Sequence, residues 1–315
     1  MARKKIRGKA GVKFKSPYTS EKRDSQLRTL VTHLIINEEV KVTESKVINA
    51  NGAKILLVDD NDLNIKVAST LLRKYNFNID SVNSGFACID KIEKVVKTIR
   101  SVSSDVIIMV DNCYCEFCSY DEPTAVGADI IVGSLIKNLG AGIVNNGAYI
   151  AGKVDLVELC AERLTSPGLG SEVGPSLGQN KNFFLGLYMA PLVVANALKV
   201  KAFTRELFKK LGFNVINENT DDIVLGIVFN DKEKLIKCVK AIQKFSAIDS
   251  VFSPEETDMP GYDNQIIMAS GSFTDGSSIE LSCDAPIRPP YVAFQQGGLT
   301  YEYGKIGVLM AINNL

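Results

Sequence analysis

The 315-residue sequence has one histidine and a formal net charge of zero. It contains no apolar run of the roughly 18 residues that a membrane-spanning helix needs, so it predicts no transmembrane segment. The basic N-terminus lacks the apolar stretch of a secretory signal. Seven cysteines without the regular spacing of a disulfide framework are typical of a reducing compartment, and we expect a cytoplasmic protein.

The charge is unevenly distributed along the chain. Residues 1–46 hold 12 Lys/Arg and 5 Asp/Glu, a net charge of +7, and the rest therefore carries −7 because the total is zero. Such a basic arm either contacts RNA phosphate or is a solvated tail. The stretch "SEKRDSQLRTLVTHLI" resembles the N-terminus of bacterial ribosomal protein seventeen of the large subunit, and this resemblance implies an RNA contact through residues 1–46.

A different pattern covers residues 47–90. The run "AKILLVDDNDLNIKVASTLL" predicts a buried strand that ends in Asp59 and Asp60 and is followed by a helix, and "NIDSV" predicts a second strand. The segment resembles the opening of a response-regulator receiver domain, in which such an acidic pair helps to bind Mg²⁺. Without that resemblance, the two carboxylates read as caps of a helix N-terminus.

Asp111, in "DVIIMVDNCYCEFC", follows another apolar run and stands where a buried strand should end. A carboxylate at the carboxyl end of a strand is a common site of chemistry in α/β proteins. In a receiver protein of the phosphorelay type, Asp111 would be the phosphoacceptor. However, the Met-Pro that should follow is replaced by "CYCEFCSYDEP", so the receiver pattern fades near residue 90.

The remaining chain predicts an α/β fold, with a mixed or parallel sheet followed by a smaller α+β unit. The expected strands are "DVIIMV", "ADIIVGS", "GAYIAGK", "DIVLGIVF", "QIIMAS" and "SSIELS". The expected helices are "KIEKVVKTIR", "DLVELCAERL" and "DKEKLIKCVKAIQKF". The long apolar stretch from "FFLGLYMAPLVV" is either one helix, kinked at Pro191, or a broken pair of helices.

Lys137 lies in "GSLIKNLGAG", between apolar residues and glycines. Burial there would lower the pKa of its amine and leave part of it neutral, as a lysine nucleophile requires. Asp111, at a neighbouring strand end, could keep a pyridine nitrogen protonated, and Ser134 could donate a hydrogen bond to a phosphate. The alternative is a structural lysine, which spacing alone favours.

A family resemblance adds to this interpretation. From about residue 91 onwards, the motifs "VDNCY", "GADIIVGSLIKN", "RLTSPGLGSEVG", "SIELSCDAPIRPPY" and "QQGGLTYEYGK" resemble the C-terminal half of the aluminium-resistance, or methionine gamma-lyase-like, family of pyridoxal-phosphate enzymes. The resemblance implies a partial large domain of the fold-type-I pyridoxal-phosphate fold over residues 91–200 and a small α+β domain over 201–315.

The same resemblance assigns roles to individual residues. Lys137 matches the cofactor-binding lysine, Asp111 the partner of the pyridine nitrogen and Ser134 a phosphate contact. Arg288 is the candidate for the substrate carboxylate, which a guanidinium can bind through two hydrogen bonds; alternatively, it pins a proline turn. The implied activity is carbon–sulfur bond cleavage in a sulfur amino acid, by a protein that forms homo-oligomers.

The sequence also departs from the family. Cys115 stands where the family usually has glycine, and the N-terminal half that would supply the phosphate-binding loop is not matched. We therefore expect a fused or truncated lyase with weak cofactor binding and impaired turnover. Cys113, Cys115 and Cys118 form a C-x-C-x-x-C run, but the only histidine is His33, so three ordinary thiols are favoured over a metal site.

Overall fold

The structure is a computed structural model, and the residues that it describes are 52, 54–58, 69–70, 72–82, 89–164, 168–172, 174, 176–246, 249–258, 263–269 and 279–315. By its contacts the chain divides into two compact units. The first holds the described residues up to Leu56 and those within 69–80, and the second holds the described residues from Ser81 to Leu315 together with Leu57 and Val58. The candidate site lies within the second unit.

Two strands near the N-terminal end of the described chain form a sheet of their own. They are β1 (Lys54–Val58) and β2 (Asn78–Val82), and both occupy the positions that the sequence predicts. Asp59 and Asp60 directly follow β1 but lie outside the described residues, as does the basic arm 1–46. The magnesium site and the RNA contact therefore stay predictions.

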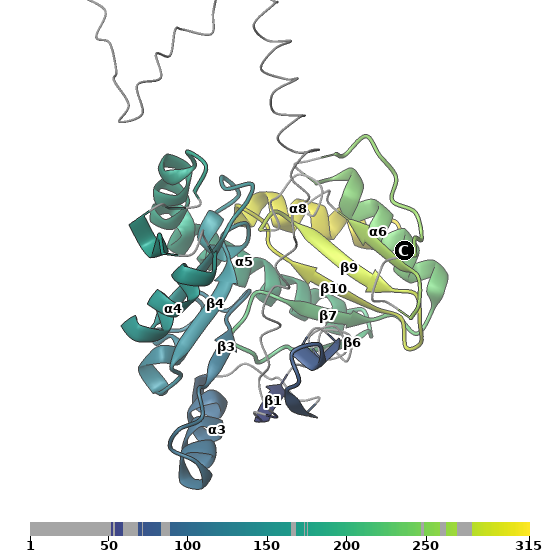
Figure 1. The fold of residues 1–315 in the computed structure, drawn as a ribbon. Coiled ribbons are helices and arrows are strands. Elements are labelled where there is room, and N and C mark those ends of the chain that lie inside the picture. Colours follow the sequence, from purple (N-terminus) through teal and green to yellow (C-terminus); the bar gives the residue numbers. More distant parts are fainter. Residues whose placement is uncertain are drawn as a thin grey trace, which may run out of the picture. The chain divides into compact units, whose positions relative to one another are not determined.

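A three-stranded sheet carries the candidate site, in the order β3-β4-β5 (Figure 1). β3 runs parallel to β4, and β5 runs antiparallel to it. The helical segments of this region come before, between and after the strands. The elements are α3 (Ile89–Val102), β3 (Met109–Asp111), η1 (Pro123–Val126), β4 (Ile130–Ser134), η2 (Asn138–Gly140), β5 (Ala148–Gly152), α4 (Val154–Leu164) and η3 (Gly170–Glu172).

Among the described strands, β3 is separate from the sheet of β1 and β2. A receiver domain would place its phosphoacceptor strand in one five-stranded sheet with the strand that carries the acidic pair. The described strands do not form such a sheet, and the phosphoacceptor alternative for Asp111 stays a prediction. β3 is also shorter than the predicted "DVIIMV" because β4 pairs only with Met109–Asp111, and Ile107 before it is 59% exposed.

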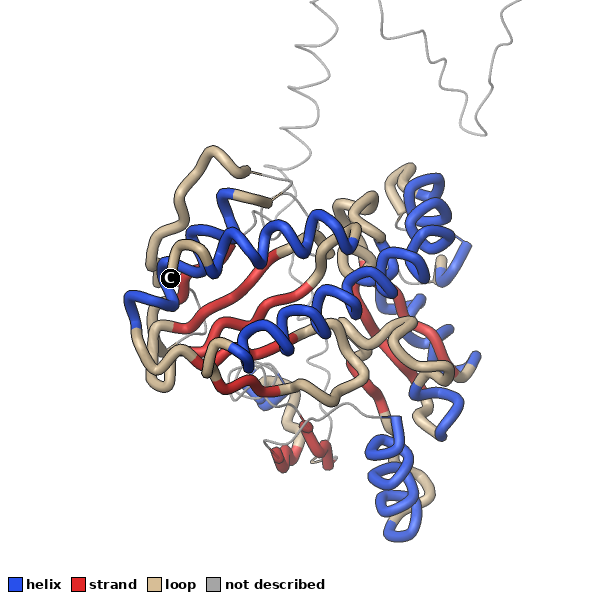
Figure 2. Tube along the Cα trace, turned by 180° about the vertical axis from the view of Figure 1, so that it is seen from behind, coloured by secondary structure: helices blue, strands red, loops and turns tan. Residues whose placement is uncertain are grey.

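The C-terminal part forms a five-stranded antiparallel sheet in the order β6-β7-β10-β9-β8. The helices of this part, α5, α6 and α8, pack on one face of the sheet (Figure 2). The elements are α5 (Asn180–Lys210), β6 (Asn214–Ile216), β7 (Leu225–Val228), α6 (Lys232–Lys244), β8 (Ile266–Ala269), β9 (Ser282–Pro286), β10 (Val292–Gln296) and α8 (Tyr301–Ile312).

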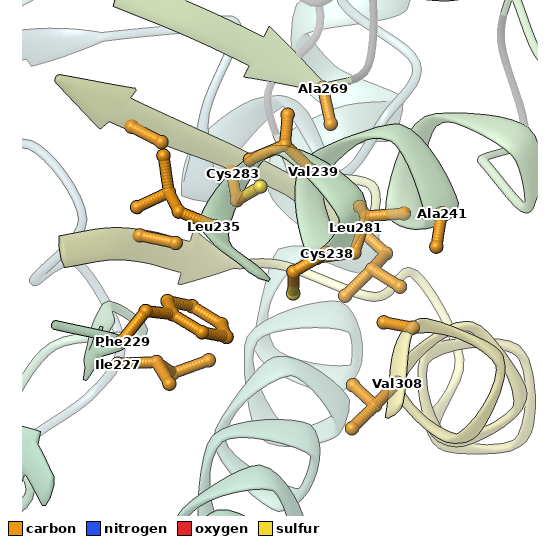
Figure 3. Close-up of a cluster of buried hydrophobic side chains, with 14 of the residues drawn as sticks. Ile227, Phe229, Leu235, Cys238, Val239, Ala241, Ala269, Leu281, Cys283 and Val308 are labelled. Carbon is orange, nitrogen blue, oxygen red and sulfur yellow. The ribbon is translucent and has the colours of Figure 1, made fainter. Parts of the chain in front are cut away.

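The alternation of side chains along each strand explains which face of the sheet packs against the helices. Leu225 and Ile227 on β7, and Cys283 and Ala285 on β9, point into one apolar cluster with the helices (Figure 3). Successive side chains of a strand point to opposite faces, so Asp284 lies on the other face of the same sheet. This face, which points away from the three helices, takes part in the candidate site.

β9 lies one strand-length later than the sequence predicts. "SSIELS" was expected to be the strand, but β9 begins at Ser282, the last residue of that run. Its sequence, "SCDAP", has low intrinsic strand propensity because aspartate and proline are depleted in strands. Pairing with both β8 and β10 overrides this propensity, and Pro286 is tolerated at the end of the strand.

α5 is one helix of 31 residues, with Pro191 inside it rather than at a break between two helices. By length and composition alone it could cross a membrane, a test that core helices of soluble proteins also pass, so the prediction of no transmembrane segment stays a prediction. Within the described chain it packs against η2, β6, β7, β10 and α8, and Val194 and Ala197 are fully buried. It also runs through residue 200, the predicted domain boundary.

Candidate active site

The predicted residues Asp111, Ser134 and Lys137 lie at one edge of the three-stranded sheet. β3 and β4 are parallel, with Asp111 opposite Val132. Asp111 is the last residue of β3, Ser134 is the last residue of β4, and Lys137 follows in the next turn. Parallel strands end at the same edge, which is where open α/β sheets bind their ligands.

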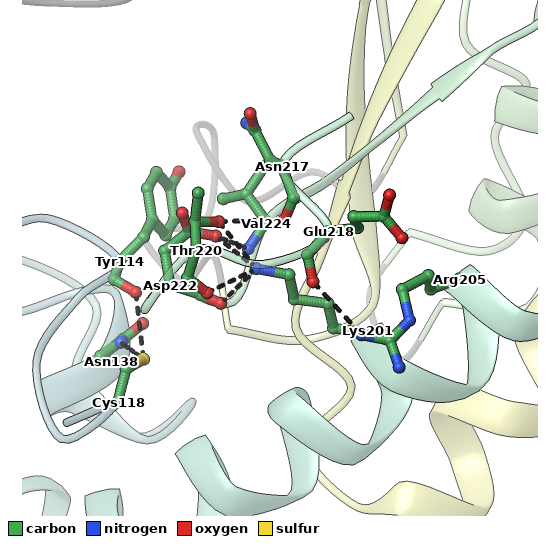
Figure 4. Close-up of polar contacts among 10 residues, drawn as sticks. All are labelled: Tyr114, Cys118, Asn138, Lys201, Arg205, Asn217, Glu218, Thr220, Asp222 and Val224. Carbon is green, nitrogen blue, oxygen red and sulfur yellow. Dashed lines mark hydrogen bonds and ion pairs between the residues drawn. The ribbon is translucent and has the colours of Figure 1, made fainter. Parts of the chain in front are cut away.

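Tyr114, in the loop after β3, is held by hydrogen bonds to its backbone oxygen and to its side-chain hydroxyl. Its backbone oxygen accepts hydrogen bonds from the Ile223 N–H (3.3 Å) and from the Cys118 thiol (3.4 Å; Figure 4), and its hydroxyl accepts one from Gln296 Nε2 (3.0 Å). Tyr114 and Phe117 have φ angles of 70° and 60°, a left-handed conformation that is uncommon for residues with side chains. Such strain persists only where surrounding contacts impose it.

Lys137 places its ammonium 4.2 Å from the centroid of the Tyr114 ring, a cation–π geometry. Burial by itself lowers the pKa of Lys137, but Tyr114, Cys113 and Asp111 act in the opposite direction and the net pKa is raised. The sequence-based expectation of a lowered pKa is therefore wrong for this form of the protein. The reason is that burial brings an aromatic ring, a thiol and a carboxylate close to the amine.

Cys113 lies between the two charged groups. Its backbone N–H donates to Asp111 Oδ1 (3.0 Å), and its thiol contacts both Asp111 and Lys137. Burial raises the pKa of Cys113 to about 11, so the thiol is neutral at neutral pH. Within the described part of the chain, no group of three His, Cys, Asp or Glu side chains that could hold a metal ion is found.

Glu116 is a buried residue that the sequence did not single out. It is 2% exposed, and its Oε1 accepts a hydrogen bond from the Tyr149 hydroxyl (3.0 Å). Its backbone oxygen accepts one from Asn138 Nδ2 (3.0 Å), beside Lys137. Residue 133 must be glycine for this packing, because a Cβ there would lie 2.6 Å from Glu116 Oε1. Burial raises the pKa of Glu116 to about 7.

We expect Glu116→Gln to stabilise the protein at alkaline pH. The folded state binds the Glu116 proton more tightly than the unfolded state, so wild-type stability falls as the pH rises from 4.5 to about 7, and glutamine removes this fall. Urea denaturation should show the variant more stable by on the order of 2 kcal/mol near pH 8, with little difference near pH 4. The exposed Glu158→Gln serves as control. A variant that is less stable at both pH values would show that Tyr149 holds a charged carboxylate.

The other two predicted residues have fewer contacts. Ser134 Oγ accepts a weak hydrogen bond from the backbone N–H of Ile136 (3.3 Å). Arg288 is exposed in the turn between β9 and β10, where its backbone oxygen accepts from the Tyr291 N–H (2.7 Å). Among the described residues, the Arg288 side chain makes no hydrogen bond or ion pair. The structure thus brings together Asp111, Ser134 and Lys137, and gives Arg288 no contact with them.

Asp284 is a further site residue that the sequence analysis missed. It lies on the face of the five-stranded sheet that points away from the helices, as does Gln296, which reaches the Tyr114 hydroxyl. Burial raises the pKa of Asp284 to about 6, and the charge of Lys137 opposes this rise. Ser282 Oγ, on the same face, is buried and has no hydrogen-bond partner among the residues that the structure describes. The sequence signal that could have found Asp284 is the alternation of apolar and polar residues in "SCDAP", which places Asp284 on the face opposite to the apolar residues.

The profile of the family described as methionine gamma-lyase matches residues 23–315. The chain belongs to this family. The match begins at residue 23, so it reaches into both segments that the sequence analysis assigned to other families, and their separate origin stays a prediction.

Two curated relatives support the assignment. An uncharacterized 33.9 kDa protein of Lactobacillus delbrueckii subsp. bulgaricus is 44% identical over 230 residues, which cover 72% of this chain and 75% of that protein. The uncharacterized protein YnbB of Bacillus subtilis is 43% identical over 231 residues, which cover 72% of this chain and 55% of that protein. The chain is thus similar to about half of YnbB.

Solved structures share the fold. A carbon-sulfur lyase involved in aluminum resistance from Clostridium novyi NT is 37% identical with a TM-score of 0.74, covering 83% of this chain and 72% of that one. A candidate cystathionine beta-lyase involved in aluminum resistance from Listeria innocua is 34% identical with a TM-score of 0.76, covering 85% and 76%. These neighbours confirm the α/β class and the predicted family.

Proposed function

We propose that this chain binds pyridoxal phosphate at Lys137 and Asp111 and uses it to cleave a carbon–sulfur bond of a sulfur amino acid by elimination. The observation that carries the proposal is the placement of an amine and a carboxylate at the ends of two adjacent parallel strands. Membership of the methionine gamma-lyase family, and relatives named as carbon–sulfur lyases, support the reaction class.

The residues present suit the chemical groups of pyridoxal phosphate. The primary amine of Lys137 can bond to an aldehyde carbon, and the exposed carboxylate of Asp111 can accept a hydrogen bond from a protonated ring nitrogen. Ser134 Oγ already accepts from Ile136, so its hydroxyl hydrogen is free to be donated to a phosphate. When bound, pyridoxal phosphate supplies an electron-withdrawing ring that stabilises negative charge at the substrate Cα.

Individual side chains of the protein would have different roles in the reaction. The Lys137 amine would be the group to take the Cα proton of the substrate and to deliver a proton to the leaving sulfur. Asp111 keeps the ring nitrogen positively charged, and the neutral thiol of Cys113 fills the space between the two charges. Arg288 remains our candidate for the substrate carboxylate.

We expect covalent attachment of pyridoxal phosphate to Lys137, at a rate that rises with pH. The raised pKa of Lys137 means that its neutral, reactive form is a small fraction at neutral pH. The rate should therefore increase about tenfold for each pH unit between about pH 7 and about pH 9. The measurement is borohydride reduction after timed incubation, followed by peptide mapping. Attachment mainly at other lysines, or a rate that is flat with pH, would contradict the proposal.

Further features belong to the same proposal. They are a fold-type-I large domain over residues 91–200, a small domain over 201–315, a homo-oligomeric assembly and reduced turnover. The attachment assay depends on none of them. The RNA-binding arm and the acidic pair of the phosphorelay alternative lie outside the described part of the chain, and no described feature favours either alternative over the lyase.

A further inference from the structure

Lys201 is a buried cation in the middle of α5. Lys201 is 5% exposed, and its ammonium group donates hydrogen bonds to four oxygen atoms of one loop (Figure 4). The partners are the backbone oxygen and hydroxyl of Thr220, both at 3.0 Å, the backbone oxygen of Asp222 at 2.8 Å and its Oδ1 at 3.0 Å. One ammonium thus holds two alternate residues of the segment between β6 and β7.

The loop that Lys201 holds is itself connected to the candidate site. Asp222 Oδ1 also accepts from the Val224 N–H (2.7 Å), which fixes the turn around Ile223. Ile223 is fully buried, its side chain packs in one apolar cluster with Tyr114, and its N–H donates to the Tyr114 backbone oxygen. The contacts therefore run without interruption from Lys201 to Tyr114.

Tyr114 is the residue whose ring lies against Lys137. Its left-handed backbone conformation has to be imposed by its neighbours, and Ile223 supplies one of the hydrogen bonds that impose it. We infer that Lys201 is a positioning residue: by holding Asp222, it keeps the 222–224 turn against Tyr114 and so holds the aromatic ring beside Lys137. The importance of that ring position for catalysis rests on the proposed function, but the positioning itself does not.

A role in overall stability alone explains this arrangement less well. The free energy needed to remove an ammonium and a carboxylate from water offsets much of the attraction between them. A buried ion pair is therefore weak evidence for stability. Arg205, one turn later on α5, provides a comparison. It contacts the same connecting segment through Glu218 O (3.3 Å), but that contact is not part of the chain of bonds to Tyr114.

The cysteines of the 113–118 loop report its position directly. Cys115 and Cys118 lie beside Tyr114, and burial raises the pKa of both thiols, so their alkylation by iodoacetamide should be slow in the folded protein. With Lys201→Met, we expect both thiols to be alkylated at least about tenfold faster, because moving the loop exposes them and a thiol pKa lower by one unit gives tenfold more thiolate. Loss of the Lys201 charge by itself would raise the Cys118 pKa and slow its alkylation, so acceleration reports movement of the loop. Mass spectrometry of the peptides gives each rate separately.

Core thiols and a matched variant separate positioning from general destabilisation. Cys238 on α6 and Cys283 on β9 are fully buried, and their rates should not change. Arg205→Met should leave all rates at wild-type values. Asp222→Asn keeps an oxygen for the Val224 N–H but loses a charge that itself raises the pKa of both loop thiols, so its rates are compared at a pH at which each thiol has the same thiolate fraction in both proteins. At equal thiolate fraction it should still accelerate the loop thiols, even if Lys201→Met does not fold.

Two results would overturn the inference. One is equal acceleration at the core and loop cysteines, which would mean global unfolding. The other is unchanged loop rates in both Lys201→Met and Asp222→Asn. The measurement needs no cofactor, so it can succeed while attachment to Lys137 fails, and the two claims are tested independently.

Discussion

Lys137→Ala is expected to eliminate site-specific attachment of pyridoxal phosphate and to lower any carbon–sulfur lyase turnover by at least about 1,000-fold. Alanine removes both the nucleophile that bonds to the aldehyde and the base that would handle the Cα proton. No other described lysine lies at this sheet edge, and Tyr114 and Cys113 cannot replace an amine. Borohydride trapping and release of a 2-oxo acid from sulfur amino acids measure the two effects.

A matched control distinguishes loss of the site from loss of the fold. Lys199→Ala removes an exposed lysine of α5 that makes no hydrogen bond or ion pair with the described residues, and it should behave as wild type. Lys137→Ala also removes a cation that packs against Tyr114, so its folding has to be checked. Urea denaturation should show that the variant remains folded. Undiminished trapping in Lys137→Ala would mean that a different lysine holds the cofactor.

Asp111→Asn is expected to separate binding from chemistry. The amide keeps an oxygen for the Cys113 N–H, so the loop should hold its conformation. It cannot keep a ring nitrogen protonated, so we expect turnover to fall by about 100-fold to 1,000-fold, as when one electrostatic partner of a transition state is removed. Loss of one charge-assisted hydrogen bond should weaken cofactor binding by about tenfold to 100-fold.

Trapping at Lys137 should persist in Asp111→Asn when the cofactor is present in excess, in contrast to Lys137→Ala. Asp121→Asn, at an exposed aspartate of the same loop region, is the control and should match wild type in both assays. Equal turnover in Asp111→Asn and wild type would exclude Asp111 as the partner of the ring nitrogen, while leaving the role of Lys137 intact.

Several elements were predictable because their signals are local. The apolar runs before Asp111 and Ser134 end in polar residues, and this is enough to place both at strand ends. The amphipathic patterns of α4 and α6 gave their positions to within one or two residues. β9 was misplaced because its strand propensity is low, and its place depends on β8 and β10, which pair with it on both sides.

The electrostatics of the site were not predictable in the same way. Lys137 was expected to have a lowered pKa, since burial is the only effect that a flanking apolar sequence suggests. Its actual neighbours come from the loop after β3, and they reverse the direction. Glu116 and Asp284 gave no sequence signal as titrating residues, because their raised pKa values arise from burial against distant segments.

The amino-acid pattern alone therefore accounts for the α/β class, the family and the order in which Asp111, Ser134 and Lys137 follow their strands, because each depends on neighbouring residues in the chain. Tertiary packing decides how Tyr114 is held, since its hydroxyl bonds to Gln296, 182 residues away. It also decides that Lys201 is buried against Asp222. Contacts between segments this far apart form only when the sheets and α5 pack together, and no periodicity in the sequence encodes them.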